Sequence, residues 1–226
     1  LGLDYTVLRQ ENPNLIYCAI SGFGQTGPRN GDPAYDQIIQ GFAGVMSITG
    51  SSETKPYRVV YPIADTSGGM AAAMSIAAAL NAEPRGAFLD VSMSDAVLSA
   101  MGWVVSNYLI GGVEPAAHGN ENTTSAPSGT FATADQPMNI AANRDEQWVS
   151  LATHIGRTDL LEHPDYVTRE MRKAHRHALR HEIETVLMTR PAQDGVKELN
   201  AIGVPSGHVL SVAQVLDDAQ IAGRDM

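Results

Sequence analysis

In the first half of the chain, helical spacing of apolar residues alternates with strand-like runs. The apolar run Leu15–Ile20 predicts a buried strand, and the near-alternation at 87–93 predicts a second one. A β-branched and aromatic segment at 58–62 predicts a third, short strand. The spacing also predicts helices, over 3–10, 34–48, 65–82 and 95–110. This alternation predicts an α/β fold.

The second half is patterned differently. Composition changes at Gly111-Gly112, and the stretch to Ser128 is rich in Gly, Asn, Thr, Pro and Ser, which indicates a linker or an active-site loop. Residues 129–133 and 138–142 then predict a β-hairpin. Helices are predicted at 145–155, 157–162, 168–188, 192–201 and 212–222, with short strand pieces at Val204 and Val209-Leu210. We expect two parts, residues 1–112 and 113–226.

Composition limits the classes of function. The net charge of -10 and pI near 5.0 argue against nucleic acid as a partner, because no basic face would offset phosphate repulsion. No stretch approaches the uncharged apolar run of a membrane span, so no membrane association is expected. The single cysteine, Cys18, excludes a disulfide within the chain and favours a reducing, cytoplasmic compartment.

The segment Gly22–Gly27 matches the letters of the dinucleotide fingerprint G-x-G-x-x-G and follows a predicted strand. The chemistry of that fingerprint needs a helix to begin at once, so that the helix N-terminus holds the pyrophosphate. Residues 28–33, which include two prolines and a glycine, are not expected to start that helix in time. The glycines still indicate a close approach of the backbone to a ligand or to a neighbouring element.

Asp65 stands between a predicted strand and a predicted helix, followed closely by Gly68 and Gly69. One interpretation is a helix N-cap. The other is chemical: a helix N-terminus stabilises a carboxylate as the anion, and the glycines leave space for a bulky partner. Such a carboxylate can attack an acyl group. The residues themselves leave both interpretations open.

Three histidines, His175, His177 and His181, fall in one predicted helix, and the last two have the i, i+4 spacing of a metal pair. No cysteine or suitably spaced carboxylate accompanies them. The basic residues Arg172, Lys173, Arg176 and Arg180 crowd the same segment and would repel a cation. We expect a solvated surface face without a metal.

Six short segments, taken in order, carry a resemblance to a known family. They are residues 12–17 leading into Ser21-Gly22-Phe23-Gly24; Pro33-Ala34-Tyr35-Asp36 with Gly41 and Thr49-Gly50; Ala64-Asp65 followed by Gly68-Gly69; Arg85-Gly86 leading to 89–93; His118-Gly119-Asn120 with Pro127 and 130–135; and 203–205 with 209–212. Each alone is weakly specific, but the ordered set spans nearly the whole chain. The chain resembles the family III coenzyme A transferases, which include formyl-CoA and carnitine-CoA transferases.

The resemblance implies an activity and a site. In such proteins the aspartate matching Asp65 attacks an acyl-CoA thioester, and CoA moves to another carboxylic acid through a mixed anhydride and an aspartyl-CoA thioester. It also implies that no metal and no permanently bound cofactor are needed, because the coenzyme A thioester is a substrate. The expected substrate- and CoA-binding residues are Ser21, Gly22, Phe23, Gly24, Tyr35, Gly68 and Gly129, the last in a loop that covers the site.

The resemblance also implies an architecture. Residues 1–112 would be part of a Rossmann-like, CoA-binding large domain that carries the catalytic aspartate, and 113–226 a linker and a smaller α+β domain. Family members form interlocked homodimers. Their nucleotide-binding half would precede Leu1 and their chains continue past Met226, so we expect this chain to be a fragment that exposes apolar surface and is inactive alone.

Two alternatives are an α-methylacyl-CoA racemase-like isomerase and a non-catalytic CoA-binding fragment. The racemases carry His-Asp where this chain has Tyr35-Asp36, and a phenol, with a reference pKa near 10, is a poor proton carrier at neutral pH. The covering loop reads 125-SAPSGT-130 here, without the glycine run of formyl-CoA-type members. The donor and acceptor acids therefore stay open.

Overall fold

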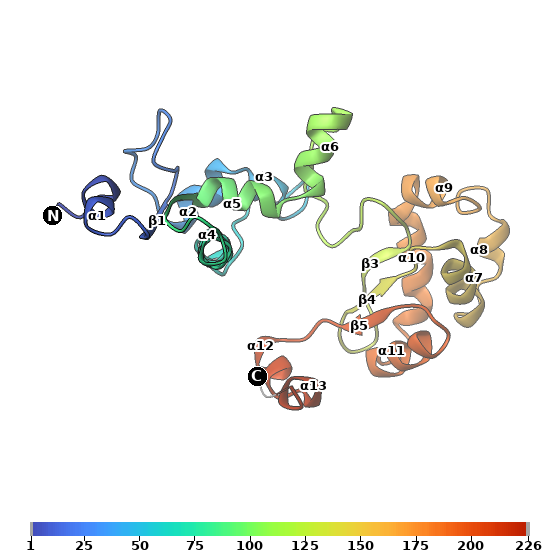
Figure 1. The fold of residues 1–226 in the computed structure, drawn as a ribbon. Helices are drawn as coiled ribbons and strands as arrows, with labels where there is room; N and C mark the ends of the chain where they lie inside the picture. The colour runs from blue at the N-terminus through green and yellow to red at the C-terminus, as the bar shows by residue number, and fades with distance from the viewer. Residues whose placement is uncertain (1, 225–226) are drawn as a thin grey trace. The chain divides into compact units, whose positions relative to one another are not determined.

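The computed structural model describes residues 2–224 and divides the chain into two compact units, Leu1–Gly119 and Asn120–Met226 (Figure 1). Each unit has its own sheet and its own buried apolar cluster. The expected assignment of the two parts to a CoA-binding domain and a small α+β domain stays a prediction.

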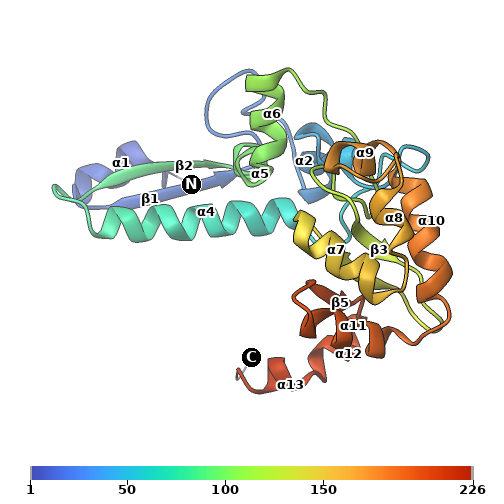
Figure 2. The same cartoon turned by 90° about the vertical axis from the view of Figure 1, so that its right-hand side faces the viewer.

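The first unit contains a β-α-β arrangement. Its elements are α1 (Tyr5–Glu11), β1 (Ile16–Ser21), α2 (Asp36–Phe42), α3 (Val45–Ile48), α4 (Ile63–Leu80), β2 (Ala87–Ser92), α5 (Met93–Ala100) and α6 (Trp103–Gly111). Strands β1 and β2 pair in parallel, from Ile16 beside Ala87 to Ser21 beside Ser92. Parallel strands need a crossover connection, and α4 runs along both strands as part of it (Figure 2).

The core of the first unit lies where α2, α4 and α5 meet. Its buried members come from these helices and their joints, and Phe23 from the loop after β1 packs against them. They are Ile39, Ala43, Val45, Ala64, Met93 and Val97. Gly68 of α4 packs against Met93, which directly follows β2, so the N-terminal part of α4 lies near the carboxyl end of β2.

Glycines interrupt two helices that the spacing predicted as continuous. Gly44 takes φ +84° and separates α2 from α3, and Gly102 takes φ +48° and separates α5 from α6. These left-handed conformations suit glycine and cannot continue a right-handed helix. Helical periodicity on both sides of each break concealed it.

The predicted strand at 58–62 is wrong, because this segment of the described chain has no sheet partner. The backbone N–H of Val59 donates to Gln40 Oε1 at 2.8 Å, and the Val59 carbonyl accepts from Gln40 Nε2 at 3.1 Å. A buried side chain thus replaces the sheet partner that the β-branched composition suggested.

Within residues 2–224, α4 is the helix whose length and composition would allow it to cross a membrane, with 18 residues and a mean hydropathy of 1.3. The sequence predicted that no stretch approaches the apolar run of a membrane span. By length and mean hydropathy, this prediction is wrong for α4. Alanine and methionine supply most of its apolar character. In the structure α4 packs against β1, β2, α2 and α5.

The second unit places helices around a small antiparallel sheet. The strands are β3 (Ser128–Phe131), β4 (Met138–Ala141) and β5 (Ser206–His208), in the order β3-β4-β5. The helices are α7 (Asp145–His154), α8 (Asp159–Glu162), α9 (Arg169–Ala174), α10 (Arg176–Leu187), α11 (Ala192–Ala201), α12 (Val212–Leu216) and α13 (Ala219–Ala222). The predicted hairpin is confirmed. Strand β5 lies between the two predicted strand pieces and contains neither.

The helix predicted over 168–188 breaks at His175 into α9 and α10, and Arg172 in α9 is only 2% exposed. Its guanidinium donates to the carbonyls of Ala126 at 2.9 Å and Tyr166 at 3.1 Å and pairs with Asp145. The prediction of a solvated face is therefore wrong for Arg172. Because each of the three guanidinium nitrogens donates to an acceptor, this cation can be buried.

Candidate active site

Asp65 is the third residue of α4, and its side chain is exposed. The N-cap position belongs to Pro62, which makes no side-chain cap, so the N-cap interpretation of Asp65 is wrong. Within residues 2–224, no hydrogen bond or ion pair involves the Asp65 carboxylate. A carboxylate in the first turn of an 18-residue helix faces the positive end of the helix dipole.

The cap of α4 comes from another helix. Asp36, the first residue of α2, accepts a hydrogen bond from the backbone N–H of Ala64 through Oδ1 at 2.7 Å. Ala64 N–H is one of the donors that a helix start leaves without an intrahelical partner. The bond ties α2 to the residue that precedes Asp65.

Gly68 and Gly69 differ in their surroundings. Gly68 is buried, and a Cβ there would lie 3.1 Å from Met93 Cγ, so packing of α4 on α5 favours glycine at this position. A Cβ at Gly69 would meet nothing within 4 Å. Gly69 follows Asp65 by four residues and lies on the same face of α4, where a side chain would lean toward Asp65. The carboxylate therefore borders bare, accessible helix backbone.

The loop after β1 is fixed by its own polar contacts. Gly24 N–H donates to Ser21 Oγ at 3.1 Å, and Gln25 N–H donates to Asp90 Oδ2 at 2.9 Å. A Cβ at Gly22 would lie 2.3 Å from Ala34 Cβ, so this glycine allows a close approach of two loop segments. No helix begins between residues 22 and 33, as the sequence predicts, and the dinucleotide geometry is not formed.

Phe23 connects this loop to the first turn of α4. Its ring meets Phe42 edge-on with 4.9 Å between centroids, and it packs against the cluster that contains Ala64. Tyr35 occupies the N-cap position of α2, 82% exposed and without a side-chain cap bond. Phe23 thus packs against the cluster that contains Ala64, and Asp36 accepts the Ala64 N–H at the start of α4. Tyr35 directly precedes Asp36.

Gly129 lies in β3 of the second unit. A Cβ there would lie 2.7 Å from the carbonyl oxygen of Asn120 and 3.2 Å from Arg180 Nη2, so local packing excludes a side chain. An open cavity of about 410 Å³ adjoins it. Its lining surface is mainly apolar, with Ile140 and Pro205 beside the polar residues Asn122, Ser128 and Ser206.

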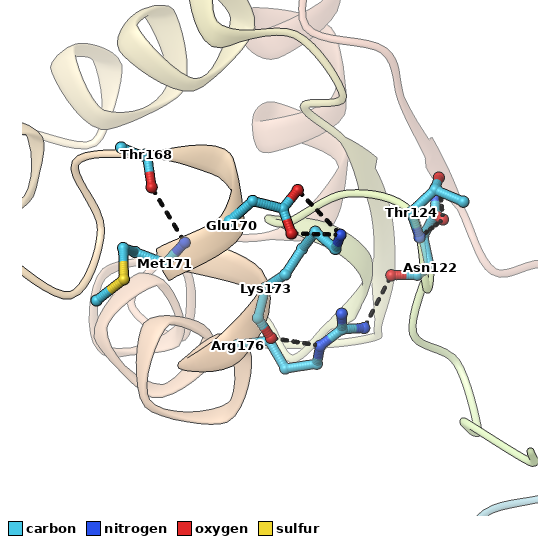
Figure 3. Close-up of polar contacts among 7 residues, drawn as sticks. All are labelled: Asn122, Thr124, Thr168, Glu170, Met171, Lys173 and Arg176. Carbon is cyan, nitrogen blue, oxygen red and sulfur yellow. Dashed lines mark hydrogen bonds and ion pairs between the residues drawn. The ribbon is translucent and has the colours of Figure 1, made fainter. Parts of the chain in front are cut away.

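The histidine segment of the second unit is part of a polar surface. Lys173 pairs with Glu170 at 2.9 Å, and Arg176 Nη1 donates to the carbonyl of Asn122 at 2.8 Å (Figure 3). His177 and His181 are exposed. No group of three or more potential metal ligands occurs among residues 2–224.

The family model of CoA-transferase family III matches residues 1–226. The chain belongs to this family. The resemblance read from six short segments is thereby confirmed, and so is membership of an enzyme family of CoA-transferases.

Several CoA-transferases align with 98–100% of this chain. Acetyl-CoA:oxalate CoA-transferase of Acetobacter aceti is 36% identical over 230 residues, which are 100% of this chain and 59% of the relative. Succinate–glutarate CoA-transferase of Agrobacterium fabrum is 33% identical, over 100% of this chain and 57% of the relative. Succinyl-CoA:mesaconate CoA-transferase of Haloarcula hispanica is 35% identical, over 98% and 57%. The chain thus spans less than two thirds of the length of these relatives.

Solved structures of the family share the mixed α/β fold. A CaiB/BaiF family protein from Brucella suis matches with a TM-score of 0.87 and 34% identity, over 100% of this chain and 60% of that one. The protein Rv3272 from M. tuberculosis matches with a TM-score of 0.88 and 27% identity, over the same shares. The predicted α/β class is confirmed over about 60% of the length of these family III structures.

Proposed function

We propose that this chain belongs to an acyl-CoA:carboxylate CoA-transferase in which Asp65 is the nucleophile. The observation that carries the proposal is an exposed Asp65 carboxylate without an ion pair or hydrogen bond among residues 2–224, in the first turn of α4. An ionised carboxylate needs both accessibility and a free lone pair to attack an acyl carbon. Gly69 adds open helix surface beside it.

The proposed reaction consists of four acyl transfers. An Asp65 carboxylate oxygen attacks the thioester carbon of the donor, the C–S bond breaks, and CoA leaves as thiolate from a mixed anhydride. The thiolate then attacks Asp65 Cγ, which releases the donor acid as a carboxylate and forms an aspartyl-CoA thioester. The acceptor carboxylate attacks Cγ in turn and expels the thiolate. Attack of that thiolate on the acceptor carbonyl gives the new acyl-CoA and free Asp65.

The other expected site residues are proposed as ligand contacts. Ser21, Gly22, Phe23 and Gly24 would line the acyl or CoA pocket together with Tyr35 and Gly68. The segment at Gly129 would cover the site and exclude water from the anhydride. We further propose a cytoplasmic, interlocked homodimer as the working enzyme.

The proposed substrates are short dicarboxylic acids and their CoA thioesters. The names of three relatives pair CoA transfer with oxalate, with succinate and glutarate, and with succinyl-CoA and mesaconate. Each of these acids carries a second carboxylate. A donor–acceptor screen with the full-length protein, read by mass spectrometry of the acyl-CoA products, identifies the pair.

The test of the nucleophile is chemical trapping in the full-length protein. During turnover, hydroxylamine should convert the acylated aspartate to a hydroxamate on the peptide that contains Asp65. Asp65→Asn should abolish both the adduct and the exchange. Asp95→Asn is the matched control, because Asp95 is the third residue of α5 and is also exposed.

Two results would contradict the proposal. One is turnover by Asp65→Asn at the wild-type rate, and the other is a hydroxamate on a different residue. Proton exchange at the α-carbon of a 2-methylacyl-CoA, without transfer of CoA to an acid, would identify a racemase instead.

A further inference from the structure

Gln40 is a polar side chain with no exposed surface, and it directly follows Ile39, a member of the apolar cluster of the first unit. It lies in α2, on the side that faces the segment before α4, where it binds Val59. A carboxamide loses hydration on burial, so it is tolerated only where its donors and acceptor find partners. The partners of Gln40 show what this side chain does.

The Gln40 carboxamide forms hydrogen bonds with two other residues of the first unit, Val59 and Asp36. Its Oε1 accepts from Val59 N–H at 2.8 Å, and its Nε2 donates to the Val59 carbonyl at 3.1 Å. The second proton of Nε2 goes to Asp36 Oδ2 at 2.7 Å. The Val59 bonds fix the orientation of the carboxamide, because a flipped amide would face the Val59 N–H with its own donors.

Asp36 links Gln40 to the start of α4, because its two carboxylate oxygens bind different residues. Asp36 Oδ2 is held by Gln40, and Asp36 Oδ1 accepts the Ala64 N–H at 2.7 Å. Holding one oxygen sets the rotamer of the carboxylate and so the place of the other. Pro62 supplies no side-chain cap, so this bond from α2 is the side-chain cap of α4 among the described residues.

We propose that Gln40 is a positioning residue for the transfer reaction. Gln40 fixes Asp36, Asp36 fixes the first turn of α4 at Ala64, and this turn carries the neighbouring Asp65. The inference rests on the proposed nucleophilic role of Asp65. Gln40 itself touches no reacting atom in this scheme, since all of its polar contacts are to Asp36 and Val59.

The first experiment measures the structural link without activity. In the full-length protein, Gln40→Met keeps the length of the side chain and removes its polar partners. Amide hydrogen exchange at the start of α4 should become roughly tenfold faster, the change expected when one hydrogen bond is lost. Asp4→Asn is the control, because Asp4 caps α1 from its own N-cap position, through Val7 N–H at 3.1 Å, and should leave exchange at the start of α4 unchanged.

The second experiment measures chemistry. In a single turnover, acylation of Asp65 by an acyl-CoA should slow by roughly 10- to 100-fold in Gln40→Met, as expected for a nucleophile displaced by a fraction of an ångström to an ångström. The KM for the acyl-CoA should change by less than about threefold, since Gln40 touches no substrate in this scheme. Asp36→Asn should act in the same direction, because Asn keeps one acceptor oxygen and its NH₂ group, a donor, cannot accept the second bond from Gln40 or Ala64. This partly exposed variant replaces Gln40→Met if the latter does not fold.

The outcomes separate the two proposals. Unchanged exchange at the start of α4 in both variants, or wild-type acylation rates with altered exchange, would overturn the positioning role. Absence of any Asp65 adduct in the wild-type protein would overturn the proposed nucleophile, and the exchange measurement would still decide whether Gln40 holds the first turn of α4.

Discussion

The open face beside Asp65 can be tested by filling it. Gly69 lies one turn after Asp65 on the same face of α4, and a Cβ at this position meets nothing within 4 Å. Side chains on a helix lean toward its N-terminus, so a methyl group at 69 points toward the carboxylate. Gly69→Ala and Gly69→Val therefore add bulk at the place where a thioester would approach.

Stability and activity should change in opposite directions. Alanine is more favourable than glycine in a helix interior by about 0.8–1.0 kcal/mol. With no contact to oppose it, Gly69→Ala should gain nearly this amount, and Gly69→Val about 0.3 kcal/mol because of its stiffer side chain. If the thioester passes over residue 69, a displacement of the reacting carbon should slow transfer by roughly tenfold for Ala and roughly 100-fold for Val.

The assay combines urea unfolding of the full-length protein, followed by circular dichroism, with acyl-CoA exchange rates. The midpoint for Gly69→Ala should rise by roughly 0.3 M urea. Ala77→Val is the control for a β-branched residue on an exposed part of α4 far from Asp65. It should lose stability slightly and keep the wild-type exchange rate.

A Gly69→Val protein that exchanges CoA within about twofold of wild type would show that substrate does not cross this face. A Gly69→Ala protein less stable than wild type would show that another part of the full-length protein occupies the space. Either result refutes the reasoning from the open glycine.

Two further predictions concern the second unit. Arg172→Met should destabilise this unit by about 3–5 kcal/mol, because the carbonyls of Ala126 and Tyr166 lose a buried charged donor. Hydrogen exchange of β3 and α10 measures this loss. An effect below about 1 kcal/mol would contradict the burial argument. The Ala192 N–H bond, with help from the Thr133 hydroxyl, lowers the pKa of Asp135 below its usual 3.8. A lowered folded pKa gives stability that is present above the unfolded pKa and lost as pH falls through the folded one, so Asp135→Asn should flatten the loss of stability below about pH 4; an unchanged acid unfolding curve would contradict it.

The local elements that the sequence predicted well are those with one dominant signal. The continuous apolar run Leu15–Ile20 predicted β1. The strand-like segments 129–133 and 138–142, separated by a short turn, predicted the hairpin of β3 and β4. In these places, neighbours in sequence supply the deciding interactions.

The misses have a different origin. The breaks at Gly44 and Gly102 lie inside helical periodicity that continues on both sides. At Gly44 both pieces bury residues in the same core, Ile39 from α2 and Val45 from α3, whereas α6 after Gly102 buries none. The segment at 58–62 has the composition of a strand, but its partner at Val59 is a side chain from α2 rather than another strand. The burial of Arg172 depends on acceptors 6 and 46 residues away.

The same distinction applies to the candidate site. Asp65 and its glycines could be selected from the sequence because a carboxylate at a helix start followed by small residues is a local pattern. The sequence could not show that Pro62 rather than Asp65 is the cap, or that Asp36 supplies the cap from 28 residues away.

The sequence by itself thus determined the family, the main strands and helices of both units, and the aspartate at the start of α4. Tertiary structure alone decided that this aspartate is left free, that Gly68 packs on Met93 while Gly69 stays open, and that Gln40 holds the cap in place. The physical reason is that hydrogen-bond partners and steric space are shared between segments distant in sequence, whereas periodicity and capping patterns act within a few residues.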